Sequence, residues 1–339
     1  MTEWNVKERK NVTHIKGKDF FMKLATSTGD FSWYVDSITE KVKNFQGSKF
    51  KYINLEQTGA IPEFFSEKDD GWKKLADEWG NAASHAGITY VVSHAPCLHF
   101  ACLNVLHGFE DETYQANVRA IRRSIEICHI LGIKRIVVHA CFSLEADFTI
   151  DMFYKYNKKF YGEFFDLMEK YNITVMVENW DSVYPLFSTG RQMRDFLDCV
   201  GHPLLAGCWD TAHGTIAKTS REIGQYQNII DIGEKLKGLH ISDNFGDTHH
   251  HSWPFAGIIN FDAVMQGLLD VKYDGYFTFE ASYTLLHQNN LPYHRQPWIY
   301  QGETVKKLLN PSIELKKQAL DLLFETGKYI LSTYHCFEN

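Results

Sequence analysis

The sequence predicts a single (β/α)8 barrel, and three observations support this prediction. Short apolar runs rich in Val, Ile, Phe and Tyr alternate with amphipathic stretches along the 339 residues. Eight such runs occur, which is the number of strands in this fold. The rival doubly wound sheet usually carries a Gly-rich phosphate turn, and neither GxGxxG nor a P-loop is present in the chain.

Continuous apolar runs are typical of parallel strands buried on both faces. The strands we expect, in chain order, are 21-FMKLATS, 50-FKYINLE, 89-TYVVSHA, 135-RIVVHAC, 174-TVMVENW, 205-LAGCWDT, 237-KGLHISD and 276-YFTFEAS.

Apolar residues spaced three or four apart predict the helices between the strands. Gly87, Gly132 and Asn172 stand where a left-handed residue would end a helix. The expected apolar faces are Val35, Ile38, Val42 and Phe45; Trp72, Leu75, Trp79 and Ala83; Val118, Ile121, Ile125 and Cys128; Phe160, Phe164, Leu167 and Tyr171; Met193, Phe196 and Val200; Ile223, Ile230 and Glu234; Phe261, Val264 and Leu268; Leu315, Ala319, Leu322 and Ile330.

We expect residues 20–339 to form one catalytic domain, with no linker dividing it. Residues 1–19 are a polar lead-in. Residues 283–311 form a long aromatic loop, followed by a helical extension after the last strand. A loop of this length in a compact domain is usually functional, so it is expected to be a lid or an interface.

Composition narrows the range of functions. Lys plus Arg is 35 and Asp plus Glu is 42, which gives a net charge of −7 and argues against nucleic acid as the main partner. The charged N-terminus is unlike a secretory signal, and no uncharged run approaches the roughly 20 residues of a membrane span. The seven cysteines form no CxxC pair and are expected to be reduced thiols of a cytoplasmic protein.

The expected strands end in residues that commonly bind metals. In barrels, catalytic groups come from these carboxyl-terminal strand ends. A carboxylate inside VMVENW or FTFEAS is costly to bury unless it is paired or bound to metal. Oxygen ligands with one imidazole suit Mn²⁺, with Co²⁺, Zn²⁺ and Mg²⁺ as alternatives. The strand-end residues are His94, His139, Glu178, Asp210 with His213, His240 and Glu280.

These motifs resemble the xylose isomerase-like superfamily of TIM barrels over residues 20–282. Similarity to its ketose 3-epimerases implies that Glu178, Asp210, His240 and Glu280 hold one divalent ion and that both glutamates exchange a proton beside a ketone. It also implies that the histidine of DTAH, His213, contacts substrate. The epimerases carry an arginine in the seventh-strand loop, where this chain has 244-NFG.

The AP-endonucleases of the same superfamily use nine ligands for three zinc ions. Their pattern falls on His94, His139, Glu178, Asp210, His213, His240, His251 and Glu280, with His249 in place of the expected aspartate. The acidic net charge argues against a DNA substrate.

The stretches 30-DFSWYV, 55-LEQTGAIPEFFSE, 93-SHAPC and 238-GLHISDNFGDTHHHSWPFAG resemble the large (α) subunit of bacterial C-glycoside deglycosidases. That resemblance implies a lyase that acts on 3-keto C-glycosides with an aromatic, flavonoid-type aglycone and works in a hetero-oligomer with a small β subunit. The chemistry is removal of the C2 proton followed by β-elimination.

Three groups compete for the catalytic base, since an imidazole suits proton transfer near neutral pH and the epimerases use carboxylates. The candidates are His139, Glu178 and Glu280. The expected substrate-binding residues are His94, His213, His251, Trp180 and Trp298. The alternative functions are a ketose or sugar-phosphate epimerase or isomerase, a three-zinc nuclease and a regulatory barrel without activity.

Overall fold

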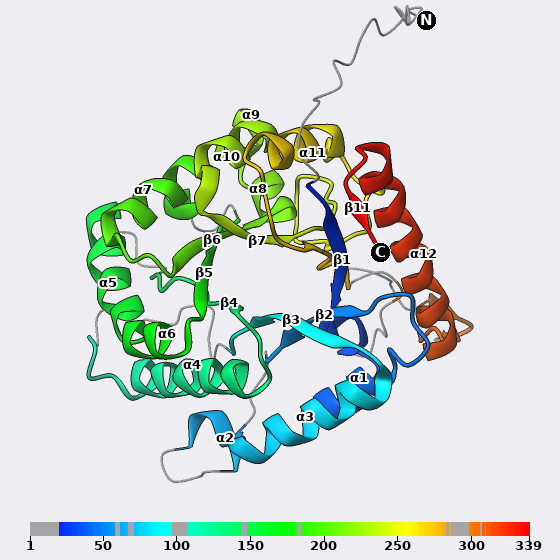
Figure 1. Ribbon diagram of the computed structural model, residues 1–339. Helices are drawn as coiled ribbons and strands as arrows, with labels where there is room; N and C mark the ends of the chain where they lie inside the picture. The colour runs from blue at the N-terminus through cyan, green and yellow to red at the C-terminus, as the bar shows by residue number, and fades with distance from the viewer. Residues whose placement is uncertain are drawn as a thin grey trace, which may run out of the picture.

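The predicted barrel is confirmed. The computed structural model of the protein describes residues 20–57, 62–66, 71–96, 108–143, 148–181, 185–282, 285, 298–305, 307–308 and 310–339. The parallel strands run in the order β1 to β7, β8 pairs with β1, and a parallel bridge between Ile241 and Phe279 joins the strand-seven and strand-eight segments. Figure 1 shows this closed ring of strands with the helices around it.

All eight expected strands are present, each within a residue or two of its predicted run or shortened inside it. They are β1 Met22–Ser27, β2 Tyr52–Glu56, β3 Thr89–His94, β4 Arg135–Val137, β5 Thr174–Glu178, β6 Leu205–Asp210, β7 Leu236–His240 and β8 Phe277–Thr278. A short C-terminal strand, β11 Phe337–Glu338, adds to β1 in parallel beside Met22 and Lys23.

The helices occupy the predicted intervals. They are α1 Ile38–Lys43, α2 Pro62–Phe65, α3 Trp72–Ala86, α4 Glu112–Ile130, α5 Ile150–Gly162, α6 Phe165–Tyr171, α7 Gly190–Val200, α8 Thr211–Ile216, α9 Lys218–Ile223, α10 Gln225–Ile232, α11 Phe261–Asp270 and α12 Ile313–Thr333, with 3-10 turns η1 Thr28–Phe31, η2 Pro185–Phe187 and η3 Gly233–Lys235. Gly87, Gly132 and Asn172 have positive φ at or just after helix ends, as the sequence predicted.

Three helical predictions are corrected. The stretch through Phe164 is two helices, because the chain breaks between α5 and α6 while the Phe164 ring stays buried. The stretch containing Ile223 breaks at Gly224, and Ile223 is exposed. In α12 the predicted buried face is half right: Ala319 and Ile330 are buried, but Leu315 and Leu322 are exposed. Their places on the buried face are taken by Lys316, Leu320 and Leu323.

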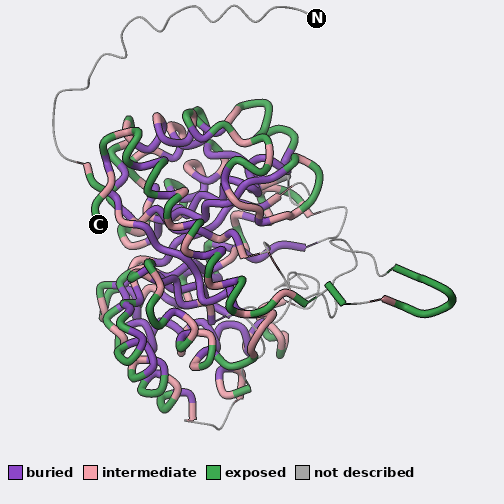
Figure 2. The backbone as a smooth tube through the Cα atoms, turned by 90° about the vertical axis from the view of Figure 1, so that its right-hand side faces the viewer, coloured by how far each residue is buried: buried purple, intermediate pink, exposed green. Residues whose placement is uncertain are grey.

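The predicted loop after strand eight contains an antiparallel hairpin, β9 Trp298–Tyr300 and β10 Glu303–Val305. All three residues of β9 are exposed, and in Figure 2 the hairpin stands away from the barrel body as an exposed loop. The predicted lead-in 1–19 and the loop tyrosines at 283 and 293 lie outside the described residues. The proposed lid or interface role of this segment therefore stays a prediction.

The core has two parts. The large one fills the space between the strands and the surrounding helices, and Figure 2 shows this buried chain as purple. The small one lies inside the barrel and consists of Val92, Val137, Met176, Ala206 and Cys208. It fills the barrel interior with apolar side chains. No helix among the described residues is both long and apolar enough to cross a membrane.

Candidate metal centre

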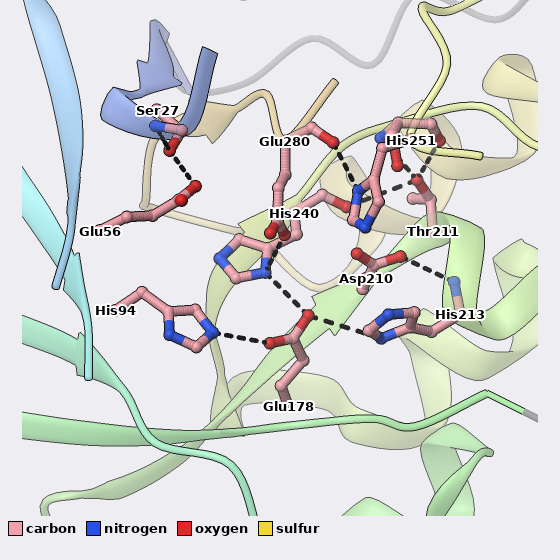
Figure 3. A network of polar contacts seen from close by, with 12 residues as sticks. Ser27, Glu56, His94, Glu178, Asp210, Thr211, His213, His240, His251 and Glu280 are labelled. Carbon is pink, nitrogen blue, oxygen red and sulfur yellow. Dashed lines mark hydrogen bonds and ion pairs between the residues drawn. The ribbon is translucent and has the colours of Figure 1, made fainter. Parts of the chain in front are cut away.

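The polar strand ends meet at one mouth of the barrel because all eight strands are parallel. Pairing sets their neighbours: Glu56 is in register with His94, and Asp210 with His240. Figure 3 shows the side chains from these strands pointing into the mouth. The described residues contain three groups of potential metal ligands. Within each group, the ligand atoms lie within 4.8 Å of one another, and Glu178 belongs to two of the groups.

The central group contains Glu178, Asp210, His240 and Glu280. Nδ1 of His240 lies 2.8 Å from Oε1 of Glu178 and 2.7 Å from Oε2 of Glu280. Asp210 is the last residue of β6 and the N-cap of α8, and its Oδ1 accepts a hydrogen bond from the backbone N–H of His213 at 2.7 Å. The buried Oδ2 of Asp210 has no hydrogen-bond partner among the described residues.

Asn179 joins two strand ends beside this group. Its Oδ1 accepts from the backbone N–H of Asp210 at 2.7 Å, and its Nδ2 donates to the Asp210 carbonyl at 3.1 Å. Its own carbonyl lies 2.8 Å from Nδ1 of His213. Asn179 therefore positions both residues, a role that the sequence does not reveal because it depends on contacts with the neighbouring strand end.

The second group joins two imidazoles to Glu178. Nε2 of His139 is 3.0 Å from Oε2 of Glu178 and 3.0 Å from Nε2 of His94. Nδ1 of His94 faces the Ala95 carbonyl at 3.0 Å, which leaves Nε2 toward the mouth. Two imidazoles and one carboxylate oxygen thus converge at hydrogen-bond distance, an arrangement suited either to moving a proton or to holding a cation.

The third group contains His213, His249 and His251. Nε2 of His213 is in short contact with Nε2 of His249, and the rings of His249 and His251 lie 4.0 Å apart. Nδ1 of His251 is 2.8 Å from the Glu280 carbonyl, and His251 has a positive φ of 38°. A left-handed, non-glycine residue is strained, and such strain is common at functional sites.

Charge is strongly coupled in the central group. Burial raises the pKa of Glu178, but His240 and the hydrogen bonds from neighbouring imidazoles outweigh it and hold that pKa well below its usual value. The pKa of Glu280 is also lowered: burial raises it, but the charge of His240 outweighs burial and brings the pKa of Glu280 to about 2. Burial alone would lower the pKa of His240, but Cys208 and both glutamates keep it well above its usual value.

The pKa values of the imidazoles outside the central group shift in different directions. Burial lowers the pKa of His139 despite its contact with Glu178, and it lowers the pKa of His249 well below the usual value. Burial also acts on His94 and His213, but nearby carboxylates prevail and raise the pKa of both. His139 is therefore suited to accept a proton at neutral pH.

These residues fit a divalent cation. Three buried or half-buried carboxylates converge on one imidazole nitrogen, and Asp210 keeps an unused buried oxygen. Carboxylates packed together repel one another unless a cation or proton lies among them. The oxygen-rich donor set with one nitrogen matches first-row divalent ions.

The two tryptophans that were predicted to bind substrate lie in different environments. Trp180 is 7% exposed, and its ring is covered by His139 at 4.6 Å, Phe142 at 4.9 Å and His213 at 6.1 Å between ring centroids. Trp180 thus forms the wall that supports two site histidines. Trp298 is 61% exposed on the hairpin, stacked on Tyr300, and the structure does not bring it to the ligand groups.

Comparison with known proteins places this site in a family. A profile described as xylose isomerase-like TIM barrel matches residues 48–300. The chain belongs to this family. The match confirms the superfamily resemblance that the strand-end motifs indicated.

Relatives of this xylose isomerase-like barrel include an uncharacterized protein of Sinorhizobium fredii, y4fM, which is 27% identical over 74% of this chain and 82% of its own length. The ketose 3-epimerase of Arthrobacter globiformis is 29% identical over 28% of this chain and 30% of its own. These relatives are similar to the chain and do not define its substrate.

Two of the solved structures that share the fold are sugar epimerases. The 3-keto-D-glucoside 4-epimerase YcjR of E. coli has a TM-score of 0.60 and 18% identity, and the match covers 76% of this chain and 91% of that one. The D-psicose 3-epimerase of Clostridium cellulolyticum H10 has a TM-score of 0.64 and 14% identity, with 91% and 99% covered. At these identities the likeness shows the barrel alone.

Proposed function

We propose that this xylose isomerase-like barrel is a metal-dependent carbohydrate epimerase or isomerase that removes a proton from the carbon next to a sugar ketone. The observation that supports this most is the convergence of Glu178, the last residue of β5, and Glu280, two residues after β8, on Nδ1 of His240. Carboxylates gathered at one mouth can hold a ketone and a base beside it, and a second base at the same mouth can return the proton to the other face of the carbon.

The names of the relatives agree with this chemistry. A ketose 3-epimerase inverts the carbon beside a C2 ketone, and a 3-keto-D-glucoside 4-epimerase inverts the carbon beside a C3 ketone. Both reactions need a base next to a carbonyl group. This common requirement supports a keto sugar as the substrate class of the chain.

Glu178, Asp210, His240 and Glu280 would hold the divalent ion, with Mn²⁺ as our first choice and Co²⁺, Zn²⁺ and Mg²⁺ as alternatives. When bound, the ion supplies Lewis-acid polarisation of the ketone, which acidifies the neighbouring C–H bond. The remaining steps belong to the protein side chains.

Exposure distinguishes the candidate bases. The side chain of Glu280 is 19% exposed and that of His139 is 16% exposed, whereas Glu178 is 2% exposed. Glu280 and His139 are therefore the groups that we propose reach the substrate proton, and Glu178 would hold His139 through the 3.0 Å contact with its Nε2. His94, His213 and His251 border the same mouth and would contact substrate oxygens.

The test is exchange of solvent deuterium into keto sugars. The metal-free chain is reloaded with Mn²⁺ and incubated in D₂O with D-fructose, D-psicose or methyl 3-keto-β-D-glucoside, and proton signals beside the ketone are followed by NMR. We expect exchange in one of these, abolished in Glu280→Gln and retained in Glu222→Gln, whose side chain is 67% exposed on α9. Equal exchange in Glu280→Gln and the unaltered protein would refute the proposal.

The second candidate is cleavage of 3-keto C-glycosides. The epimerases' strand-seven arginine is replaced by Asn244, Phe245 and Gly246, and the Asn244 side chain is tied to the Thr248 carbonyl in a short hydrogen bond. The absence of that arginine favours a β-elimination, which begins with the same removal of a proton beside the ketone as epimerisation. The base takes the C2 proton, the C1–C2 double bond forms, the C1–aryl bond breaks, and the aryl carbon takes a proton.

This lyase would work with a small β subunit in a hetero-oligomer, as the sequence resemblance implies. Its assay is release of the aglycone from a 3-keto C-glucoside by the chain alone and after addition of the partner. Release without deuterium exchange into free ketoses would favour the lyase over the epimerase.

Metal stoichiometry separates both candidates from a three-metal nuclease, which the three ligand groups would accommodate geometrically. Elemental analysis of the untagged chain should find one divalent ion per chain, lost in Glu280→Gln. Near three zinc ions per chain, with His249 required for one of them, would favour the nuclease instead.

A further inference from the structure

One carboxyl group at the mouth has no part in the chemistry above. Glu56 is the last residue of β2 and is in register with His94. Side chains in register on parallel neighbours point to the same face of a sheet, so Glu56 points into the mouth as His94 does. Figure 3 shows Glu56 on the wall across from Glu280 and His240.

The turn after β1 holds this carboxyl group in place. The Ser27 hydroxyl donates a short hydrogen bond to Oε1 of Glu56 and accepts one from the backbone N–H of Gly29 at 2.9 Å. A Cβ atom on Gly29 would lie 2.4 Å from both carboxyl oxygens, so only glycine lets the group rest on this turn. The Glu56 backbone N–H donates to the Thr28 hydroxyl at 3.0 Å.

Glu56 also lies within electrostatic reach of the central group. Burial raises the pKa of Glu56, and the charge of Glu280 raises it further, while His94 and Lys41 act in the opposite direction. The wall of β1 and β2 thus combines a carboxyl group and a hydroxyl group near the catalytic carboxylates. Such polar pairs recognise hydroxyl groups, and neither Glu56 nor Ser27 offers the positive charge with which a phosphate is bound.

We propose that Glu56, positioned by Ser27 and Gly29, is a substrate-binding residue that accepts a hydrogen bond from a hydroxyl of an uncharged sugar. The substrate class is therefore an unphosphorylated sugar or glycoside. This inference rests on the proposed function for the location of the ketone, because a ketone held beside Glu280 leaves the other hydroxyls of the sugar to face this wall. Ser27 is a positioning residue that acts through Glu56.

The test measures binding rather than turnover. The Mn²⁺-loaded full chain is titrated calorimetrically with D-fructose, methyl β-D-glucoside, D-sorbitol and D-fructose 6-phosphate. We expect a neutral ligand to bind more tightly than the phosphate. Glu56→Gln should weaken neutral-ligand binding by about tenfold and narrow that preference, since one charge-assisted hydrogen bond is lost. Ser27→Ala should weaken it less, and Glu222→Gln should not change it.

Sorbitol has no ketone, so its binding does not depend on proton abstraction. Absence of deuterium exchange in the unaltered chain would refute the proposed function while the effect of Glu56→Gln on sorbitol binding still decides this inference. Three results would overturn it: unchanged neutral-ligand affinity in Glu56→Gln, tighter binding of the phosphate, or no binding of any neutral ligand. An equal loss of Mn²⁺ affinity would also overturn it, because Glu56 would then belong to the metal site.

Discussion

The buried ion pair between Lys316 and Asp30 leads to a quantitative prediction. Lys316 in α12 is fully buried, and its Nζ lies 3.0 Å from the Ser282 carbonyl and 3.7 Å from Oδ1 of Asp30. Oδ2 of Asp30 accepts from the Thr26 hydroxyl at 2.6 Å. The pair therefore ties the C-terminal helix to the turn that carries Gly29.

We expect Lys316→Met to destabilise the fold by about 4 kcal/mol. Coulomb attraction at 3.7 Å is about 4 kcal/mol with an effective dielectric constant of about 20. This agrees with the roughly 3 to 5 kcal/mol that follows removal of one partner of a buried pair. Burial raises the pKa of Asp30 and lowers that of Lys316, so each charge depends on the other.

The assay is guanidinium unfolding of the metal-free chain followed by circular dichroism. The double variant Asp30→Asn with Lys316→Met should regain most of the loss, because no lone buried charge remains. Lys317→Met, on the same helix but less buried, is the matched control. A single variant within about 1 kcal/mol of the unaltered chain, or a double variant no more stable than the single one, would refute the reasoning.

The remaining predictions concern the site and its packing. Mn²⁺ binding should release about one proton near neutral pH, because the raised pKa of His240 keeps the metal-free imidazole protonated and the metal needs it neutral. The affinity for Mn²⁺ should therefore rise with pH. Calorimetry in buffers of different ionisation enthalpy would measure the proton release. His139→Gln should slow deuterium exchange by about 10²- to 10⁴-fold with Mn²⁺ stoichiometry intact, whereas His129→Gln, whose ring stacks on Tyr171, should not. Gly214→Ala should cost about 1 to 3 kcal/mol in unfolding experiments, since its Cβ would lie 2.5 Å from Cζ2 of Trp209, while Gly162→Ala, with open space, should not destabilise.

Much of the site follows from local sequence, because a parallel barrel collects its strand ends at one mouth. Once VVSHAP, VMVENW and FTFEAS are recognised as strands, His94, Glu178 and Glu280 must meet there. The glycines and the asparagine at helix ends are likewise local, since their left-handed backbone depends on the residue itself.

Other features depend on partners distant in the chain. Glu56 looks like an ordinary polar residue after an apolar run, and only contact with Ser27 and Gly29 gives it a fixed place in the mouth. Trp298 was expected near substrate on its residue type, but an aromatic side chain does not reveal which surface it meets, and the hairpin leaves it exposed.

The sequence by itself determined the order of strands and helices, the barrel, and the chemical character of the mouth, because alternation of apolar runs and the residues at their ends are local properties. Tertiary structure alone decided which face of α12 is buried, since helical spacing defines a stripe but not its direction. Tertiary structure also buried Lys316 against Asp30, which lies 286 residues earlier in the chain. It also fixed the distances at which Glu178 and Glu280 meet Nδ1 of His240, because these depend on pairing register across the closed sheet.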